Sequence, residues 1–269
     1  MIDKLMSSEQ ADIYHMICID RCGYHYSQRG ARTKSAVHAC AEYNIVLSKL
    51  MIPKPFMIVA HSYGGDIARQ YHRMYPNHVA GILFIDSSTE YTTTIYKPAT
   101  YITKVNQLAT EHNIKYKLYG VTPEQYEYIS YIESMNPLHE QYEAEELNAT
   151  EQLHHKLRDT NELIQHTQPL KDIPITVLTS ENNYCSCYTH VTQYLTSDEI
   201  KQYGDIAQSI DKQLIQRQID LSYLSSNSRH ITVSGSGHQI QMNEPQLVAD
   251  EVNLLLQRIK SSDTKIPYM

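Results

Sequence analysis

The sequence predicts an α/β protein built on a mostly parallel sheet with helices on both faces. Short apolar runs typical of buried parallel strands alternate with segments of helical periodicity, and three such runs with intervening helices fall within the first third of the chain. Alternation of this kind indicates parallel strands joined by right-handed crossovers. A chain of 269 residues, 41% hydrophobic and 20% charged, can bury the core that such a fold needs.

The first third of the chain supplies strands, turns and crossover helices in order. Buried strands are expected at residues 15–20, 56–60 and 79–85. Helices are expected at residues 33–50 and 66–74, and a proline soon after each one prevents a longer helix. Between the second strand and its helix there is room only for a tight turn.

The chain changes character in the middle and then returns to the first pattern. Residues 89–171 are helical in pattern and rich in Tyr and Glu, so we interpret them as a helical cap inserted between core strands. Residues 1–88 and 172–269 then form the core. Its second part is expected to contain strands at 173–179 and 229–233, and helices at 205–224 and 246–260, the last opened by Pro245.

Composition argues against several classes of protein. The net charge of -7 has the wrong sign for a nucleic-acid binder. No apolar window is long enough to span a membrane, and the first residues lack the apolar core of a signal peptide, so we expect a cytoplasmic protein. Five cysteines suggest no disulfide framework, and Cys185, Cys187 and His190 lack the second half of a zinc site. We therefore expect no metal and no cofactor.

Ser62 stands where a buried strand turns directly into a helix, between Ala60 and the pair Gly64 and Gly65. Such a turn needs small neighbours, because the backbone of the serine is strained and its hydroxyl is pushed out above the sheet. The N-terminus of the following helix favours negative charge beside the serine. Ser62 is therefore a candidate nucleophile, which needs a base and an orienting carboxylate.

The base and the acid have candidates in the chain order serine, acid, histidine. His238 lies in a Gly-rich loop after the last strand, where it can reach the carboxyl edge of the sheet. Asp86 ends the strand after the Ser62 helix, and Glu181, which follows the next strand, is the rival. We favour Asp86 as the acid, because a short Asp at a strand end suits the orienting role. His61 is interpreted as a packing residue of the strand end.

These stretches resemble the serine branch of the α/β-hydrolase fold family. The resemblance rests on residues 20–24 (Asp-Arg-Cys-Gly-Tyr), 60–65 (Ala-His-Ser-Tyr-Gly-Gly), 79–87 and 236–238 (Ser-Gly-His), and it covers nearly the whole chain. It implies that Ser62 is the nucleophile, that His238 is the general base and acid, and that the backbone N–H of Tyr63 binds the oxyanion. The acid position after the earlier strand, a known variant in the family, falls on Asp86.

Two departures from the family pattern bear on function. Ala60 replaces the first glycine of the turn, a small change. Family members also carry further strands and a His-Gly oxyanion loop before the strand that ends at Asp20, whereas this chain begins a few residues before it. We therefore expect an N-terminally shortened hydrolase with an exposed sheet edge through which it self-associates.

The leading hypothesis is a serine hydrolase that cleaves a carboxylic ester, amide or lactone of a small or medium-sized molecule through an acyl-enzyme intermediate. Aspartate-nucleophile chemistry on the same fold is excluded by Ser62. The second hypothesis, motivated by the missing oxyanion loop, is a catalytically inactive α/β-hydrolase fold that serves as a binding or scaffold module.

Overall fold

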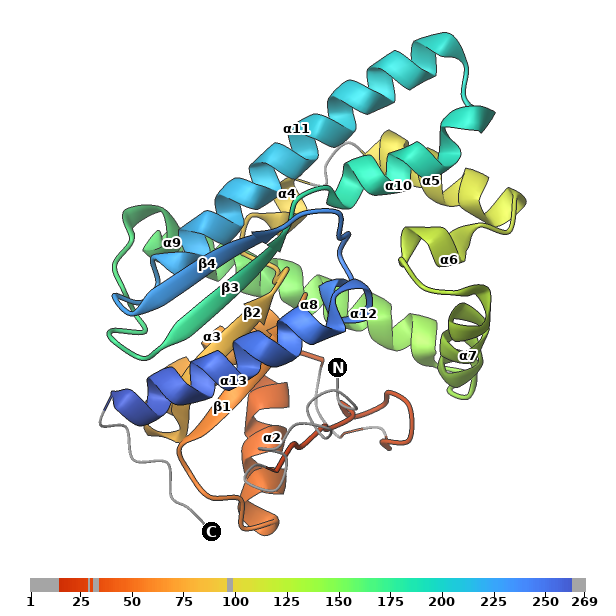
Figure 1. Ribbon diagram of the computed structural model, residues 1–269. Coiled ribbons are helices and arrows are strands. Elements are labelled where there is room, and N and C mark those ends of the chain that lie inside the picture. The colour runs from red at the N-terminus through yellow and green to blue at the C-terminus, as the bar shows by residue number, and fades with distance from the viewer. Residues whose placement is uncertain (1–14, 29, 31–33, 96–98, 263–269) are drawn as a thin grey trace.

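A four-stranded parallel sheet forms the centre of the protein in the computed structural model, which describes residues 15–28, 30, 34–95 and 99–262 (Figure 1). The strands are β1 (Phe56–His61), β2 (Val79–Ile85), β3 (Ile175–Ser180) and β4 (Ser228–Val233), and they follow one another in that order across the sheet. His61 pairs with Ile85, and Ile85 pairs with Leu178. The carboxyl ends of the first three strands therefore lie side by side, and the predicted α/β class is confirmed.

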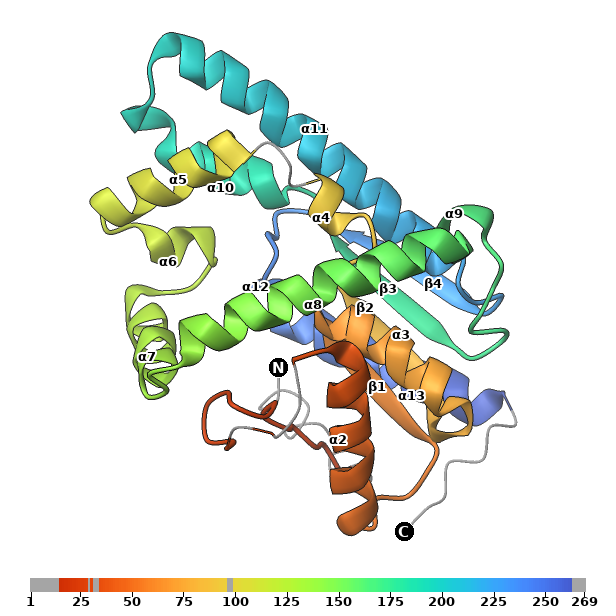
Figure 2. The same ribbon diagram turned by 180° about the vertical axis from the view of Figure 1, so that it is seen from behind.

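Helices cover both faces of the sheet, as the alternating side chains of β2 require. Ile82 and Phe84 point into a core shared with α2 (Ala36–Lys49) and α3 (Gly64–Met74). Leu83 and Ile85 point the other way and pack against α13 (Pro245–Ser261). The two views show α13 in front of the sheet in Figure 1 and α3 in front of it in Figure 2.

The strand expected at residues 15–20 is absent, and that prediction was wrong. The segment has no regular structure, and the side chains of Met16 and Ile17 are exposed. A strand is stabilised by hydrogen bonds to a neighbouring strand, and within the described residues β2 is the only partner of β1. Here the segment leads instead into a turn that contacts the helix α8 (His139–Thr160), since Arg21 forms an ion pair with Glu146 at 2.8 Å.

Between β2 and β3 the described residues form helices and loops. The helices are α4 (Thr92–Ile95), α5 (Ala99–Glu111), α6 (Lys115–Leu118), α7 (Pro123–Ser134), α8 (His139–Thr160) and α9 (Glu162–Gln165). The long helix α8 passes across α3 (Figure 2). The division of the chain into a core and an inserted cap stays a prediction, because α5 and α6 share an apolar cluster with helices that follow β3.

After β3 the chain forms α10 (Asn183–Val191), which the sequence pattern did not indicate, and then α11 (Ser197–Ser222). Helix α11 begins eight residues before the predicted start at residue 205. A capping box explains this early start: Thr196 Oγ1 accepts from Glu199 N at 3.3 Å, and Glu199 Oε2 accepts from Thr196 N at 2.9 Å. The short helix α12 (Ile240–Asn243) precedes α13.

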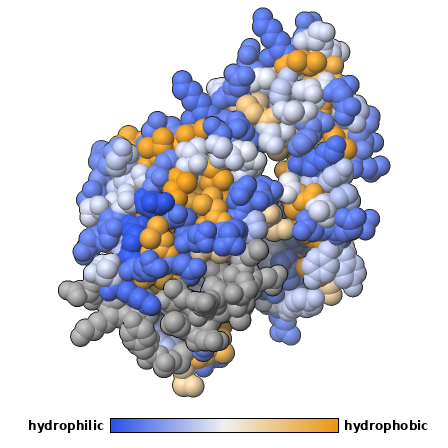
Figure 3. Space-filling view, viewed as in Figure 1, coloured by the Kyte–Doolittle hydropathy of each residue, from blue (hydrophilic) through white to orange (hydrophobic). Residues whose placement is uncertain are grey.

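The surface is mostly polar on the face shown in Figure 3, with apolar side chains gathered near its middle. None of the helices in the described ranges is both long enough and apolar enough to cross a bilayer. The cytoplasmic location and the self-association through a sheet edge stay predictions.

Candidate active site

Ser62 occupies the turn between β1 and α3 with a left-handed backbone, φ 51°. A positive φ is uncommon for a residue with a side chain, so the surrounding contacts must hold it there. Ser62 N donates to Ile85 O at 3.2 Å, and Ser62 O accepts from Gly65 N and from Ser88 N, both at 2.9 Å. These backbone contacts fix the strained turn that the sequence predicts.

The close approach of α3 to the loop after β2 explains why a glycine follows the turn. A Cβ atom added to Gly65 would lie 2.5 Å from Ser87 Cβ and 2.8 Å from Ser87 Oγ. At Gly64 the nearest atom, Ala60 Cβ, would lie at an ordinary contact distance of 3.7 Å. Ala60 is buried, and its methyl group would keep an ordinary distance even from a side chain at Gly64. The turn therefore accepts alanine at this position.

Asp86 is the first residue after β2 and also has a positive φ, 39°. Its Oδ1 accepts a hydrogen bond from Ser180 N at 3.1 Å. Its Oδ2 accepts from His238 Nδ1 at 2.6 Å and from Asn183 Nδ2 at 3.3 Å. The carboxylate is thus held from three directions with only 9% of its side chain exposed.

The structure brings His238 to Asp86 and not to Glu181, whose described side-chain partner is Asn182 at 3.4 Å. Because Nδ1 of His238 donates to Asp86, its Nε2 is left as the nitrogen that can accept a proton. Within the described residues the Ser62 hydroxyl makes no hydrogen bond, with His238 or with any other group. Such a contact is often long in a ligand-free site and tightens when substrate binds.

His61 contacts the loop that carries His238, so its interpretation as a packing residue of the strand end was incomplete. Its Nε2 donates to the backbone carbonyl of His238 at 2.9 Å, and the two rings lie 4.5 Å apart. Burial, together with the charge of His238, lowers the pKa of His61 to about 4. His61 is therefore neutral at pH 7 and does not oppose a positive charge on His238.

The start of α3 lies beside the Ser62 turn and supplies the N–H groups that a developing negative charge would need. Tyr63 is the N-cap residue, and the first N–H groups of a helix have no partner within it. In the described part of the chain no backbone carbonyl accepts from Tyr63 N. This N–H is thus available in the position that the resemblance assigns to an oxyanion donor.

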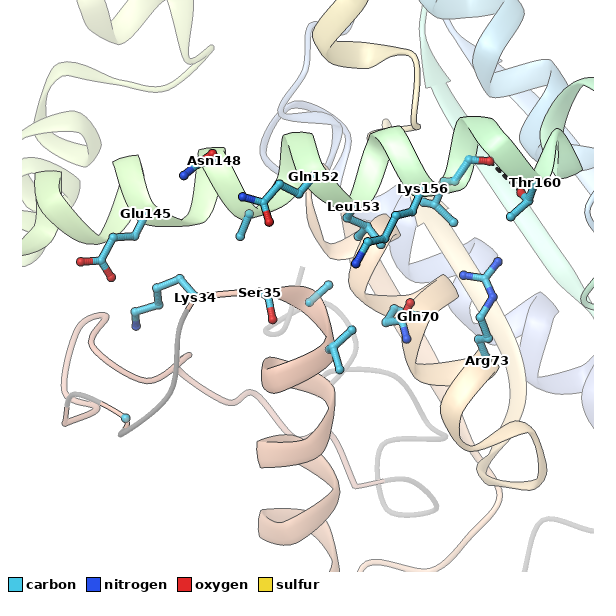
Figure 4. A pocket seen from close by; sticks show the side chains of 15 residues that line it. Lys34, Ser35, Gln70, Arg73, Glu145, Asn148, Gln152, Leu153, Lys156 and Thr160 are labelled. Carbon is cyan, nitrogen blue, oxygen red and sulfur yellow. Dashed lines mark hydrogen bonds between the residues drawn. The ribbon is translucent and has the colours of Figure 1, made fainter.

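A cavity of about 1070 Å³ lies away from these residues, between α2, α3 and α8 (Figure 4). Its labelled lining includes Lys34, Arg73 and Lys156, and it includes none of Ser62, Asp86 and His238. The described residues contain no cluster of His, Cys, Asp and Glu that could hold a metal ion. The candidate site is therefore located by the geometry of its side chains and not by a cavity.

Sequence reasoning missed the residues that hold the three candidates in place. Asn183 could have been identified from the sequence, because it is a polar residue just beyond a strand. From there it can reach the same edge of the sheet as Asp86. The backbone of Ser180 carries no such signal, because any residue there has an N–H group. The contact of His61 depends on how the His238 loop folds back over the edge.

Comparison with known proteins identifies the family of the chain. The family model described as "alpha/beta hydrolase fold" matches residues 3–245. The chain belongs to the alpha/beta hydrolase fold family. A curated relative, an AB hydrolase superfamily protein of Gibberella zeae, is 24% identical over 90% of this chain and 78% of its own length.

Solved structures of the alpha/beta hydrolase fold also resemble this member of the family. Cfl2 from Burkholderia cenocepacia has a TM-score of 0.56 at 13% identity, covering 93% of this chain and 81% of that one. A thermophilic esterase from Thermogutta terrifontis has a TM-score of 0.52 at 15% identity, covering 96% and 84%. At these identities the likeness shows the fold, and membership of the family supports a hydrolase.

The contact of Gly65 with Ser87 predicts opposite effects of alanine at two adjacent glycines. Gly65→Ala should lower the free energy of unfolding by about 1–3 kcal/mol, because the new methyl group overpacks a buried contact. Gly64→Ala should leave it unchanged or raise it by up to about 1 kcal/mol, because alanine favours a helix more than glycine does. Urea unfolding followed by circular dichroism measures both, and equal effects would contradict the packing argument.

The lowered pKa of His61 predicts how stability depends on pH. Between pH 6.5 and about 4 the unfolded chain takes up a proton on this side chain and the folded chain does not. The folded state therefore loses stability as the pH falls through that range. His61→Gln, which keeps a donor for the His238 carbonyl, should make the loss shallower, whereas His155→Gln at an exposed site is the control. Parallel curves for the parent and His61→Gln in urea titrations would exclude this contribution.

Proposed function

We propose that the protein is a serine hydrolase that cleaves a carboxylic ester, amide or lactone of a small or medium-sized molecule. The observation that carries the proposal is the 2.6 Å contact between His238 Nδ1 and Asp86 Oδ2, one strand away from a serine held at positive φ. This pairing leaves His238 Nε2 as a base at the edge of the sheet where Ser62 turns.

The proposed reaction proceeds in two halves. Ser62 Oγ attacks the substrate carbonyl carbon while His238 Nε2 takes its proton, and the resulting oxyanion is bound by Tyr63 N–H. His238 then returns the proton to the leaving alcohol or amine, and the acyl group stays on Ser62. Water, deprotonated by His238, attacks the acyl-enzyme and releases the acid, and the proton goes back to Ser62. Asp86 holds the imidazole and stabilises its charged form throughout.

The substrate class is supported by the fold and by the names of similar structures. The Thermogutta terrifontis protein is an esterase, and a protein from Acinetobacter baumannii, with a TM-score of 0.53 at 14% identity, is described as a putative lipase. Both cover more than nine-tenths of this chain. An ester is therefore the first substrate to test.

An inactive binding module is the second candidate. The observation that favours it is that, among the described residues, the Ser62 hydroxyl has no hydrogen bond to His238, whose side chain contacts Asp86. Labelling of the serine separates the two candidates.

Ser62→Ala should abolish reaction with a fluorophosphonate. Intact-mass analysis of the parent chain is expected to show a single adduct, because only an activated serine reacts quickly with such a probe. The adduct should be absent in Ser62→Ala and should persist in Ser226→Ala, which alters an exposed serine. Ester hydrolysis should fall on the order of 10⁴-fold or more in Ser62→Ala. A folded parent chain without an adduct would support the inactive module.

A matched pair of carboxylate-to-amide changes tests the choice of acid. Asp86→Asn should lower kcat by about 10⁴-fold, because an amide stabilises the wrong imidazole tautomer and cannot stabilise the charged ring. Glu181→Gln should leave kcat nearly unchanged, since that side chain does not contact His238. Steady-state hydrolysis of p-nitrophenyl butyrate gives both values, and the reverse ranking would assign the acid to Glu181.

A further inference from the structure

A buried polar cluster is joined to the Ser62 turn through Ser88 and takes no part in the proposed chemistry. At its centre is Asp66, in the first turn of α3, with no exposed side-chain surface. Its Oδ2 accepts from Ser88 Oγ at 2.5 Å and from His154 Nε2 at 2.9 Å. His154 comes from α8 and is only 1% exposed. Ser88 and His154, which are far apart in the sequence, thus donate hydrogen bonds to the same carboxylate.

Ser88 connects this cluster to the backbone of the candidate nucleophile. Its N–H donates to Ser62 O at 2.9 Å, and its Oγ lies 3.3 Å from the same oxygen. Asp66 holds that hydroxyl by the shorter of its two contacts. The contacts therefore run from His154 through Asp66 and Ser88 to the carbonyl of Ser62, the residue with φ 51°.

A hydrogen-bond donor to the Asp66 carboxylate, such as His154, is important for the proposed reaction. Asp66 lies in the helical turn that presents the Tyr63 N–H group, and an unpaired carboxylate there would oppose a second negative charge on the substrate oxygen, most strongly in a buried site. Among the described residues Asp66 Oδ1 has no partner, so Oδ2 carries both hydrogen bonds. His154 supplies the donor from the helix that crosses over α3.

Contacts of α8 with the segment that follows β2 also hold His154 in place. Its Nδ1 lies 3.5 Å from Thr93 Oγ1, and one turn further along α8 Arg158 donates to the backbone oxygen of Glu90 at 2.5 Å. Glu90 in turn forms a fully buried ion pair with Arg69 of α3, also at 2.5 Å. The imidazole therefore reaches Asp66 from a helix that Arg158 holds one turn further on.

We propose that His154 is a positioning residue, which from α8 holds Asp66 and, through Asp66 and Ser88, fixes the backbone of Ser62 for attack. This role rests on the proposed function of Ser62. Because the side-chain partners of His154 are Asp66 and Thr93 and not Ser62, we expect its loss to change the chemical step and to leave substrate binding in place. A purely structural role for His154 would change stability alone.

The test compares three variants on α8 with the full chain. His154→Leu removes the donor and keeps the volume, His154→Gln restores a donor at the position of Nε2, and Leu157→Ala removes a buried apolar contact of the same helix without touching Asp66. Fluorophosphonate labelling rates, and kcat and KM for p-nitrophenyl butyrate, are measured below the melting temperature of each variant. His154→Leu should lower the labelling rate and kcat by about 10- to 100-fold with KM unchanged, the size of effect expected from a small misplacement of a reacting group.

The remaining outcomes decide the matter. Recovery in His154→Gln, together with parent-like rates in Leu157→Ala, supports the positioning role. Parent-like rates in His154→Leu, or an equal loss in Leu157→Ala, overturn it while the serine hydrolase proposal stands. A parent chain without Ser62-dependent labelling overturns both proposals.

If His154→Leu does not fold, Ser88→Ala carries the same test. It breaks the link between Asp66 and Ser62 at a half-buried position and leaves the Ser88 N–H in place. A lower kcat with an unchanged KM supports the proposal, and unchanged labelling overturns it.

Discussion

The parallel register of β1, β2 and β3 is the constraint on which the candidate site depends. Because His61 pairs with Ile85, the next residues, Ser62 and Asp86, leave the sheet side by side, and both turn through a left-handed backbone. The third strand then delivers Ser180 N to the Asp86 carboxylate. A shift of one residue in either pairing would turn every side chain of that strand to the opposite face and separate these groups.

One side of α3 carries charged residues at helical spacing, and their partners lie on three different segments. Asp66 pairs with His154 of α8 and Arg69 with Glu90 after β2, both buried, whereas Arg73 pairs with Glu162 of α9 nearer the surface. Buried ion pairs add little net stability, because removing the charges from water is costly. Their geometry is demanding, however, so the Asp66–His154 pair determines which part of α8 lies against the start of α3. The same face of α3 thus both packs against its neighbours and supports the candidate site.

Much of this fold could be predicted from local pattern. β2 was predicted with its observed bounds, and the turn at Ser62 was evident because a strand, small residues and a helix follow one another without a spare residue. The segment at residues 15–20 has the apolar pattern of a strand, but pattern cannot show whether a neighbouring strand accepts its hydrogen bonds. Likewise, nothing local distinguishes His154 among 14 histidines, since its partner is 88 residues away.

Helix α11 packs against two separate apolar clusters. Near its middle Ala207 and Ile210 pack with α5 and α10, and near its end Leu221 packs beneath the sheet. Between these contacts Asp211 accepts from the first N–H groups of α10. A helix loses its hydrogen bonds cooperatively, so disorder that starts in either core spreads along α11 to the other. We therefore expect the α5–α10 cluster and the sheet to unfold as a single cooperative unit, with amide protons that exchange with solvent through shared openings.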